Sequence, residues 1–236
     1  MPLTIIGRPT EQQLLASELV SHACTGFAFG KGITFTSGIK SPGVYGDCRK
    51  ALSHPYLRKL ILGQYSEFMF TSSFRSDLKC SFVAGVETGG IGLGALVAHE
   101  ARLPYIGVRK AAKGHGDTSW FSGDTELVRG KQGILVEDMT TTAGSLLRAG
   151  DTLREKLDAH ANDALTVFSY NFPEMIEATD SAGMNVRTLC TFDRMLDFAV
   201  SNDHDTDITP EYESVIEKWL VNPRDESWIT NEWKFN

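Results

Sequence analysis

The sequence predicts an α/β fold with a mostly parallel central sheet flanked by helices. From residue 82 onward, short apolar runs typical of buried strands alternate with amphipathic segments of helical length. Loops rich in glycine or hydroxyl residues join strand to helix at 85–92 and 138–145. Strands that alternate with helices form right-handed crossover units, and such units place their strands parallel in one sheet.

Residues 1–50 are expected to contribute an N-terminal helix and a small hood beside the sheet. The helix is predicted over 11–24, with Thr10 as its cap. A tight turn at Ser37-Gly38 separates two short predicted strands, 33–36 and 44–48.

The remaining elements follow in a regular order. The expected helices are 55–71, 91–102, 144–157, 173–182, 192–200 and 210–220, the last capped by Thr209. The expected strands are 82–86, 105–108, 134–137, 164–170 and 186–190. We expect a single domain over 1–236, with a C-terminal helical tail from about residue 205 whose final part packs irregularly.

Composition narrows the class of protein. A chain of 236 residues with 42% hydrophobic residues can bury one substantial core. No apolar run reaches the length of a membrane span, and no basic segment followed by an apolar one opens the chain. The cysteines lack metal-ligand spacing, as is typical of a reduced cytoplasmic protein. The net charge of −7 argues against a nucleic-acid surface.

One strand-to-helix loop carries two adjacent acidic residues. Strand 134–137 ends at Glu137 and Asp138, and small residues follow before the helix at 144. Backbone N–H groups in such a loop, together with the helix dipole, can bind a phosphate. Helix capping alone would explain the loop equally well. The carboxylates at the end of the strand favour a ligand that has both a phosphate and hydroxyls, such as a sugar phosphate.

Two further segments fit a ligand with a second phosphate group. The glycine loop at 85–92 opens on the same crevice, although close packing of helix on strand would also explain it. A basic lid, residues 109–116, follows a buried strand and is either a solvated face or a loop that closes on a polyanion.

The turn at 36–42 is either a simple connection or a cover over a planar anionic substrate, with Arg49 close behind it.

Together these motifs resemble the orotate phosphoribosyltransferases, a family of type I phosphoribosyltransferases. The resemblance extends from about residue 30 to 228. The basic Arg-Lys-x-x-Lys-x-His lid is specific to the orotate enzymes, whereas the acidic-pair loop marks the wider superfamily. The segments that carry the resemblance are 36–42, 85–92, 108–116, 136–145 and 168–173.

The resemblance implies the type I phosphoribosyltransferase fold and a specific reaction. In that reaction the 5-phosphoribosyl group of phosphoribosyl pyrophosphate passes to orotate, giving orotidine 5′-monophosphate and pyrophosphate for pyrimidine nucleotide biosynthesis. The resemblance also implies Mg²⁺ held mainly by the substrate, with no dedicated protein metal site. It further implies a cytoplasmic homodimer in which each lid reaches the neighbouring active site, with no nucleic-acid or membrane partner.

Roles for individual residues follow from the same resemblance. The 5′-phosphate is expected on Thr141, Thr142, Ala143, Gly144 and Ser145, and the ribose hydroxyls beside Glu137 and Asp138. Pyrophosphate is expected on Thr88, Gly89, Gly90, Arg109, Lys110, Lys113 and His115. The catalytic set is Lys113 as the principal cation with His115, Glu137 and Asp138, and orotate is expected near Ser37, Gly38, Arg49 and Asn171.

Several positions depart from the family's pattern. Thr36 and Gly89 stand where some members have lysine, and Tyr170-Asn171 stands where some have an orotate-binding arginine. Ala143 stands where the phosphate loop commonly has glycine. These differences leave open a phosphoribosyltransferase for another base. A non-catalytic sensor of phosphoribosyl pyrophosphate would need a nucleic-acid-binding surface that this acidic chain lacks, and a plain interaction domain leaves the basic lid unexplained.

Overall fold

A seven-stranded sheet organises the protein, whose structure is a computed structural model that describes residues 4–70, 80–114, 116–201, 208–231 and 233–235. The strand order is β1-β11-β10-β9-β6-β7-β8. All neighbouring strands are parallel except β7 and β8, which confirms the predicted mostly parallel α/β fold. The strands are β1 (Thr4–Ile5), β6 (Val83–Val86), β7 (Tyr105–Val108), β8 (Phe121–Ser122), β9 (Gln132–Thr140), β10 (His160–Ser169) and β11 (Asn185–Thr191).

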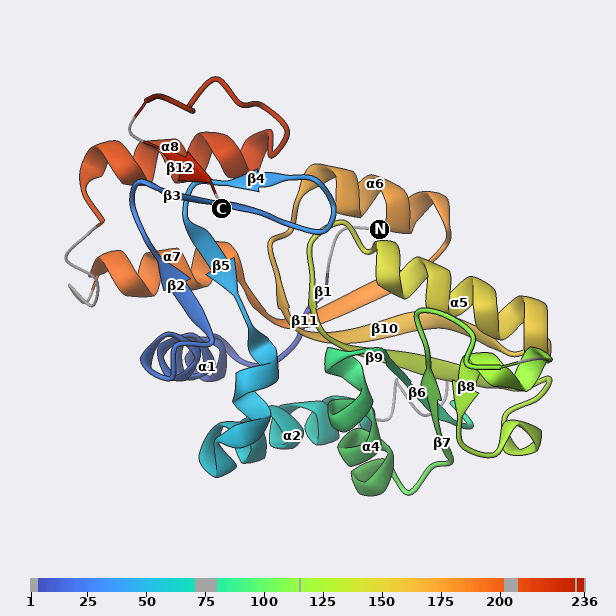
Figure 1. Ribbon diagram of the computed structural model, residues 1–236. Helices are drawn as coiled ribbons and strands as arrows, with labels where there is room; N and C mark the ends of the chain where they lie inside the picture. The colour runs from blue at the N-terminus through green and yellow to red at the C-terminus, as the bar shows by residue number, and fades with distance from the viewer. Residues whose placement is uncertain (1–3, 71–79, 115, 202–207, 232, 236) are drawn as a thin grey trace.

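The strand order determines which helices cover which face of the sheet. The helices described are α1 (Pro9–Ser21), α2 (Pro55–Phe70), α4 (Gly89–Ala101), α5 (Gly144–Leu157), α6 (Pro173–Ser181), α7 (Phe192–Ser201) and α8 (Pro210–Val221). The chain crosses the sheet in one direction from β6 to β7, and in the other from β9 through β10 to β11. Because such crossovers are right-handed, α4 lies on one face and α5 and α6 lie on the other (Figure 1).

The reversal of strand order places a ligand site between β6 and β9. Open α/β sheets bind ligands at the carboxyl ends of their strands, at the point where the order reverses. Both β6 and β9 lead at that end into a helix, α4 and α5 respectively. The two loops that the sequence analysis selected therefore open on the same crevice.

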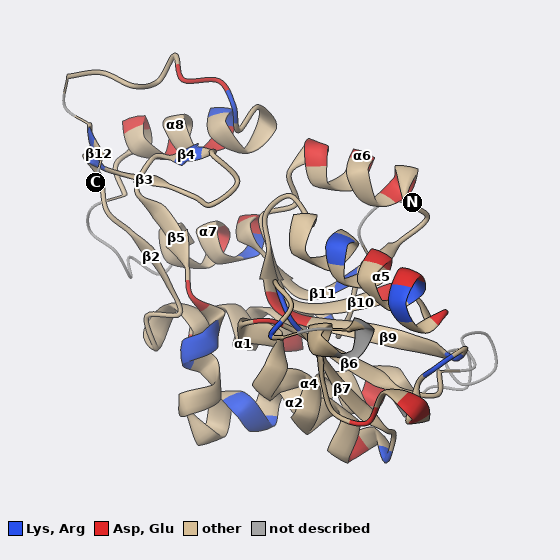
Figure 2. Ribbon diagram, turned by 45° about the vertical axis from the view of Figure 1, so that its right-hand side comes forward, with Lys and Arg blue, Asp and Glu red and all other residues tan. Residues whose placement is uncertain are grey.

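Helix α5 illustrates how the sequence pattern produces this layering. Its buried residues Leu146, Ala149, Leu153 and Leu157 recur every three or four positions, which places them on one stripe against the sheet. Basic and acidic residues alternate over the rest of its surface (Figure 2). The helix spans the predicted residues 144–157.

The hood, residues 25–50, is built from short strands outside the main sheet. Its strands β2 and β5 pair antiparallel, and β3 lies between β4 and a strand from the C-terminal end of the chain. Figure 1 shows β3, β4 and β12 beside α8, at the edge of the molecule away from β7 and β8. The strands are β2 (Thr25–Phe27), β3 (Lys31–Thr34), β4 (Lys40–Ser41), β5 (Val44–Gly46) and β12 (Lys234–Phe235).

Of the two predicted helix caps, one is confirmed and one is wrong. Thr209 caps α8, because its hydroxyl accepts a hydrogen bond from the backbone N–H of Tyr212 at 3.3 Å. Helix α1 begins at Pro9 rather than after Thr10, and Arg8 is its cap residue. The Arg8 N–H donates to the Glu11 carboxylate at 2.8 Å, so the acidic residue three positions on fixes the start of the helix.

Several other boundaries also differ from the prediction, those of β3, β5, β10 and β11 among them. Strand β9 continues to Thr140, so the acidic pair lies inside the strand and not beyond its end. Helix α4 begins at Gly89, two residues earlier than expected. The last part of the chain was expected to pack irregularly, yet it contains β12, paired with β3. No helix in the described part of the chain is long and apolar enough to span a membrane.

Candidate active site

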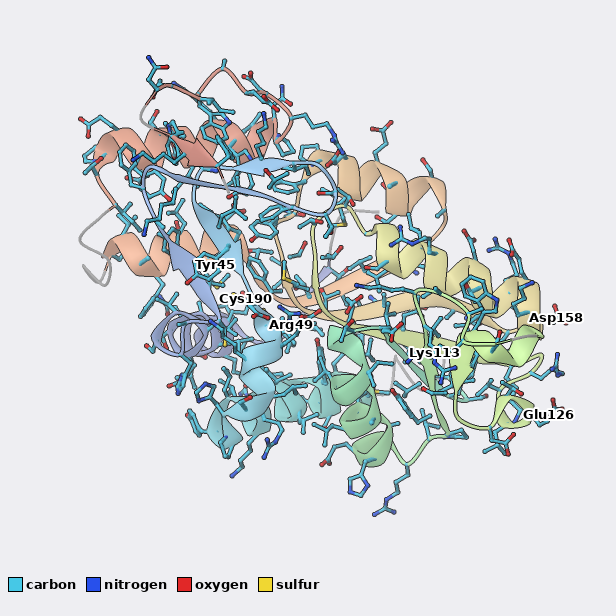
Figure 3. The ribbon with its side chains drawn as sticks, viewed as in Figure 1. Tyr45, Arg49, Lys113, Glu126, Asp158 and Cys190 are labelled. Atoms are coloured by element: carbon cyan, nitrogen blue, oxygen red, sulfur yellow. The ribbon has the colours of Figure 1, made fainter. Side chains whose placement is uncertain are left out.

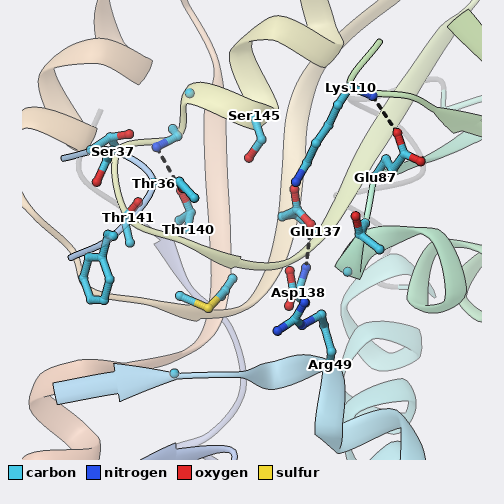
Figure 4. Close-up of a pocket in the computed structure, with 18 of the residues that line it drawn as sticks. Thr36, Ser37, Arg49, Glu87, Lys110, Glu137, Asp138, Thr140, Thr141 and Ser145 are labelled. Carbon is cyan, nitrogen blue, oxygen red and sulfur yellow. Dashed lines mark hydrogen bonds between the residues drawn. The ribbon is translucent and has the colours of Figure 1, made fainter. Parts of the chain in front are cut away.

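A pocket of about 550 Å³ lies between the hood and the carboxyl ends of β6 and β9 (Figure 4). Five segments far apart in the sequence meet there. They are the turn after β3, the segment at the end of β5, the loop after β6, the start of the lid after β7, and the loop that joins β9 to α5. The lining residues are Thr34–Ser37, Gly46, Asp47, Arg49, Glu87–Gly89, Lys110, Glu137–Ser145 and Arg148.

The loop predicted for the 5′-phosphate lines one wall of this pocket. All five of its predicted residues, 141–145, are among the lining residues, and α5 begins within the loop. The Ala143 N–H donates to the Thr140 hydroxyl at 3.0 Å. The wall therefore combines hydroxyl groups with the positive end of a helix dipole, an arrangement that attracts phosphate.

Ala143 adopts a left-handed backbone conformation, with φ of 59°. A residue with a Cβ is strained in that region, whereas glycine is not. The side chain is also almost completely buried. The departure from glycine noted in the sequence therefore falls at a position where glycine would be the less strained residue.

Glu137 and Asp138 form a buried acidic pair on the floor of the pocket, with only 4% and 9% of their surfaces exposed. The Glu137 Oε1 atom accepts from the Gly90 N–H at 3.1 Å. Burial, followed by the charge of Asp138, raises the pKa of Glu137 to about 9. Burial also raises the pKa of Asp138, against hydrogen bonds and the Arg49 charge that oppose it. A pKa of about 9 favours the protonated form of Glu137 at neutral pH.

The glycine loop after β6 packs tightly against this acidic pair. Thr88 and Gly89 line the pocket, whereas Gly90 lies behind it and donates to Glu137. A Cβ built on Gly89 would overlap the Asp138 carboxyl group, and one on Gly90 would overlap the Val136 carbonyl. Asp138 therefore fills the space that a side chain at position 89 would occupy in this structure.

The lid residues are divided between the pocket and the surroundings. Lys110 lines the pocket, and its backbone N–H donates to the Glu87 carboxylate at 2.8 Å. The Arg109 guanidinium instead donates to the carbonyls of Ser119, at 2.9 Å, and Phe121. Arg109 thus holds the base of the lid in this conformation, and its place on pyrophosphate stays a prediction.

Lys113 lies outside the pocket in this conformation. Its side chain is exposed, and its backbone N–H donates to the Ser119 carbonyl at 3.0 Å. Figure 3 places Lys113 on the lid loop, apart from Arg49 in the pocket. The predicted His115 lies outside the described residues.

The residues predicted near orotate are only partly brought together. Ser37 and Arg49 line the pocket, whereas Gly38 and Asn171 are not among its lining residues. The Arg49 guanidinium donates to Asp47 at 2.6 Å and lies beside Asp138 (Figure 4). Asn171 sits in a left-handed turn, and its N–H donates to the Ser169 hydroxyl at 3.0 Å.

Tyr170 is part of the core and not of the pocket. Its ring stacks on Phe172 and Phe192, at centroid distances of 5.3 and 5.6 Å. Where some family members have an orotate-binding arginine, this protein therefore has a tyrosine that packs into the core. Arg49 is the basic residue that lines the pocket on the side of the hood.

Several pocket residues were not predicted from the sequence. Phe35 and Met139 supply apolar surface, and Asp47 orients Arg49. Arg148 reaches the pocket from α5, one turn beyond the phosphate loop. The position of Phe35 directly before the hood motif was an available signal, whereas an arginine on an amphipathic helix is usually solvated.

Comparison with known proteins agrees with this geometry. A family model described as "Phosphoribosyl transferase domain" matches residues 61–158. An orotate phosphoribosyltransferase of Phocaeicola vulgatus is 33% identical over 214 residues, covering 91% of this chain and 96% of that protein. One of Cereibacter sphaeroides is 35% identical over 227 residues, covering 95% and 91%. The solved orotate phosphoribosyltransferase of Aeropyrum pernix matches with a TM-score of 0.65 and 25% identity, covering 80% of this chain and 99% of that one. The chain therefore belongs to the orotate phosphoribosyltransferase family, within the type I phosphoribosyltransferases.

Proposed function

We propose that this protein transfers the 5-phosphoribosyl group of phosphoribosyl pyrophosphate to N1 of orotate, in pyrimidine nucleotide biosynthesis. One observation carries the proposal: the buried pair Glu137 and Asp138 lies on the same pocket floor as the loop at the start of α5. Carboxylates beside a phosphate-binding loop suit the ribose hydroxyls and the 5′-phosphate of the donor. The full-length similarity to orotate phosphoribosyltransferases supports the choice of acceptor.

The donor fits the pocket with its two phosphate-bearing ends apart. The 5′-phosphate belongs on residues 141–145, where hydroxyls and the dipole of α5 converge. The pyrophosphate belongs near Thr88 and Gly89, with Lys110 beside it. Arg148, also in the lining, adds positive charge close to the 5′-phosphate loop. Glu137 and Asp138 then lie between the two ends, beside the ribose.

The reaction breaks the bond between C1′ and a pyrophosphate oxygen and forms a bond from C1′ to N1 of orotate, which loses its proton. Positive charge builds on the ribose ring as negative charge builds on the leaving group. Asp138 would lie beside the ribose ring on which positive charge builds, and the lid cations would stabilise the negative charge on the leaving pyrophosphate. A protonated Glu137 can donate a hydrogen bond to a ribose hydroxyl.

Mg²⁺ fits this pocket as a partner of the donor. Its ligands of choice are oxygens, and it is usually held through substrate phosphates with one or two carboxylates. Among the described residues no group of three or more His, Cys, Asp or Glu could hold a metal ion. We assign Mg²⁺ to the pyrophosphate of the donor, where it would neutralise charge on the leaving group.

Two features support a homodimer with shared active sites. Lys113 is exposed outside the pocket of its own subunit, and Arg109 is engaged with the base of the lid. A lid that closes over the neighbouring subunit's pocket would use Lys113 and His115 there. We place the protein in the cytoplasm because its cysteines are unpaired, as is usual in a reducing compartment.

Orotate would lie on the hood side of the pocket, near Phe35, Ser37 and Arg49. The aromatic ring can stack on a planar base, and the guanidinium matches a carboxylate in geometry and charge. A phosphoribosyltransferase for another base is the alternative. Tyr170 and Asn171 stand where some family members have an orotate-binding arginine, and neither residue lines the pocket.

One assay separates these two possibilities. The protein is incubated with phosphoribosyl pyrophosphate, Mg²⁺ and either orotate, uracil or a purine base, and loss of base absorbance is followed. We expect orotate alone to be consumed, and Arg49→Leu to raise the KM for orotate more than that for the donor. Turnover of uracil or a purine without orotate would favour the alternative.

A further inference from the structure

The C-terminal strap, residues 223–235, runs back from α8 over the hood. Arg224 pairs with Glu174 of α6 at 2.7 Å, and the chain then passes to the outer edge of β3 (Figure 1). There β12 pairs with β3 in parallel, with Lys234 opposite Lys31 and Phe235 opposite Gly32. The strap therefore supplies one strand of the sheet that forms the hood.

Phe235 occupies the space that a side chain at position 32 would fill. A Cβ built on Gly32 would overlap the Phe235 ring. The same ring lies 6.0 Å from the ring of Trp228, which in turn packs at 5.0 Å against Trp233. Glycine at 32 and an aromatic residue at 235 thus form a matched pair across two strands.

The remaining contacts of the strap lead to the same part of the hood. Trp233 packs on Phe29 at a centroid distance of 5.1 Å, and the Lys234 N–H donates to the Gly30 carbonyl at 2.9 Å. Glu226 pairs with Lys40 of β4 at 2.7 Å, but both side chains are exposed and such a pair stabilises little. The aromatic contacts and the strand pairing are therefore the main attachment.

The hairpin of β3 and β4 has little strand pairing of its own, although α8 also contacts the hood through the Tyr212 hydroxyl, which donates to the Pro42 carbonyl at 2.7 Å. Strands β3 and β4 share only the pairs Ile33–Ser41 and Thr34–Lys40. Two-stranded hairpins of this size are at best marginally stable, and a third strand with an apolar face is what makes such a sheet stable. Strand β12 is that third strand.

The same hairpin carries the acceptor side of the pocket. Thr34, the last residue of β3, and residues 35–37 after it line the pocket, whereas no described residue of the strap does. We propose that the strap is a positioning element for the acceptor base: through the contact of Phe235 with Gly32 it fixes β3, and thereby places Phe35 and Ser37 over the pocket. The identity of that base as orotate rests on the proposed function.

Four variants of the full-length chain test this proposal. Phe235→Ala removes the ring, Gly32→Ala displaces it, and the double variant removes both ring and clash. Phe235→Leu restores apolar bulk. Lys234→Ala is the matched control, because that side chain is exposed on the same strand. For each protein the KM for orotate, the KM for phosphoribosyl pyrophosphate, kcat and the melting temperature are measured.

We expect Phe235→Ala and Gly32→Ala to raise the KM for orotate about three- to tenfold, the effect of one lost aromatic contact. The KM for the donor stays near its normal value, because the strap contacts described above are with the hood and α6 and not with the loops at 85–92 and 138–145. Phe235→Leu recovers most of the loss, and Lys234→Ala behaves as the unmodified chain. The double variant resembles Phe235→Ala, because the clash at position 32 is gone.

A second measurement does not depend on turnover. Hydrogen–deuterium exchange in Phe235→Ala should increase at backbone amides of 33–41 and stay unchanged at 140–145. Equal effects on both KM values, or unchanged exchange in the hood, would overturn the proposal. If the unmodified chain does not consume orotate, the proposed function fails, and the exchange data alone still decide whether the strap positions the hood.

Discussion

The carboxyl group of Asp138 fills the space that a side chain at position 89 would occupy, so that Gly89 and Asp138 interlock across the floor of the pocket. Gly89 starts α4 and Asp138 lies in β9, and these two elements flank the reversal of strand order. The absent side chain at 89 is therefore part of what positions the carboxylate that faces the ribose in our proposal.

Replacement of Gly89 by alanine should impair catalysis strongly. The added Cβ forces the Asp138 carboxylate away from its position, and a misplacement of about 1 Å in a catalytic site can reduce turnover by roughly 10²-fold. We expect kcat to fall on that scale while the protein stays folded. Gly63→Ala in α2 is the control, because a Cβ there meets no atom within 4 Å. Normal turnover in Gly89→Ala would show that the interlock is unimportant.

Ala143→Gly should stabilise the protein. Ala143 has a left-handed backbone with φ of 59°, and relief of that strain outweighs the added freedom of glycine in the unfolded chain, by about 0.5–1 kcal/mol. Urea unfolding measures the difference. Ala149→Gly, inside α5, is the control and should lose stability. A less stable Ala143→Gly protein would mean that the Cβ contributes packing that exceeds the strain.

The acidic pair predicts how stability depends on pH. Glu137 has a pKa of about 9 in the folded protein and 4.5 as its ordinary value, so the folded state binds the proton more tightly. The contribution of Glu137 to the free energy of unfolding is complete below pH 4.5. It is lost as the pH rises toward 9, at up to about 1.4 kcal/mol per pH unit.

Denaturant unfolding between pH 5 and 9 measures this slope, and Glu137→Gln should flatten it. Burial also raises the pKa values of Asp138, Asp163 and Asp193, so part of the slope should remain in that variant. An unfolding free energy with the same pH dependence in both proteins would contradict the assignment of a proton to Glu137.

Lys113→Ala should reduce turnover by about 10²–10³-fold, the usual effect of removing one group that stabilises transition-state charge. Donor binding should change little, because Lys113 does not line the pocket in the conformation described. Steady-state rates and calorimetric titration with phosphoribosyl pyrophosphate measure the two quantities. Lys59→Ala, an exposed lysine of α2, is the control. Near-normal turnover without Lys113 would remove its catalytic role.

Features governed by neighbouring residues could be predicted from the sequence. Strand β7 and helix α5 have the predicted bounds, because apolar spacing defines both. The loops at 85–92 and 138–145 meet in one pocket because parallel strands bring their carboxyl ends to one edge. The last residues of β9 were missed, since burial of the charged Asp138 in a strand is not expected from its polarity. The first residues of β9 and β10 were missed as well.

Features governed by distant residues could not be predicted. Arg109 is held by carbonyls at Ser119 and Phe121, and nothing in the lid motif indicates those partners. Strand β12 pairs with β3 across most of the length of the chain, and a two-residue strand leaves no periodic signal. The basic lid suggested that its cations gather around one ligand, whereas of Arg109, Lys110 and Lys113 only Lys110 lines the pocket in the conformation described.

The central claim is tested most directly by the products of a single reaction mixture. The protein is mixed with orotate, phosphoribosyl pyrophosphate and Mg²⁺, and orotidine 5′-monophosphate and pyrophosphate are quantified together over time. We predict that the two products appear in equal amounts, and that neither forms once Mg²⁺ is chelated. Pyrophosphate release without orotidine 5′-monophosphate, or no reaction with orotate under conditions in which another base reacts, would contradict the account.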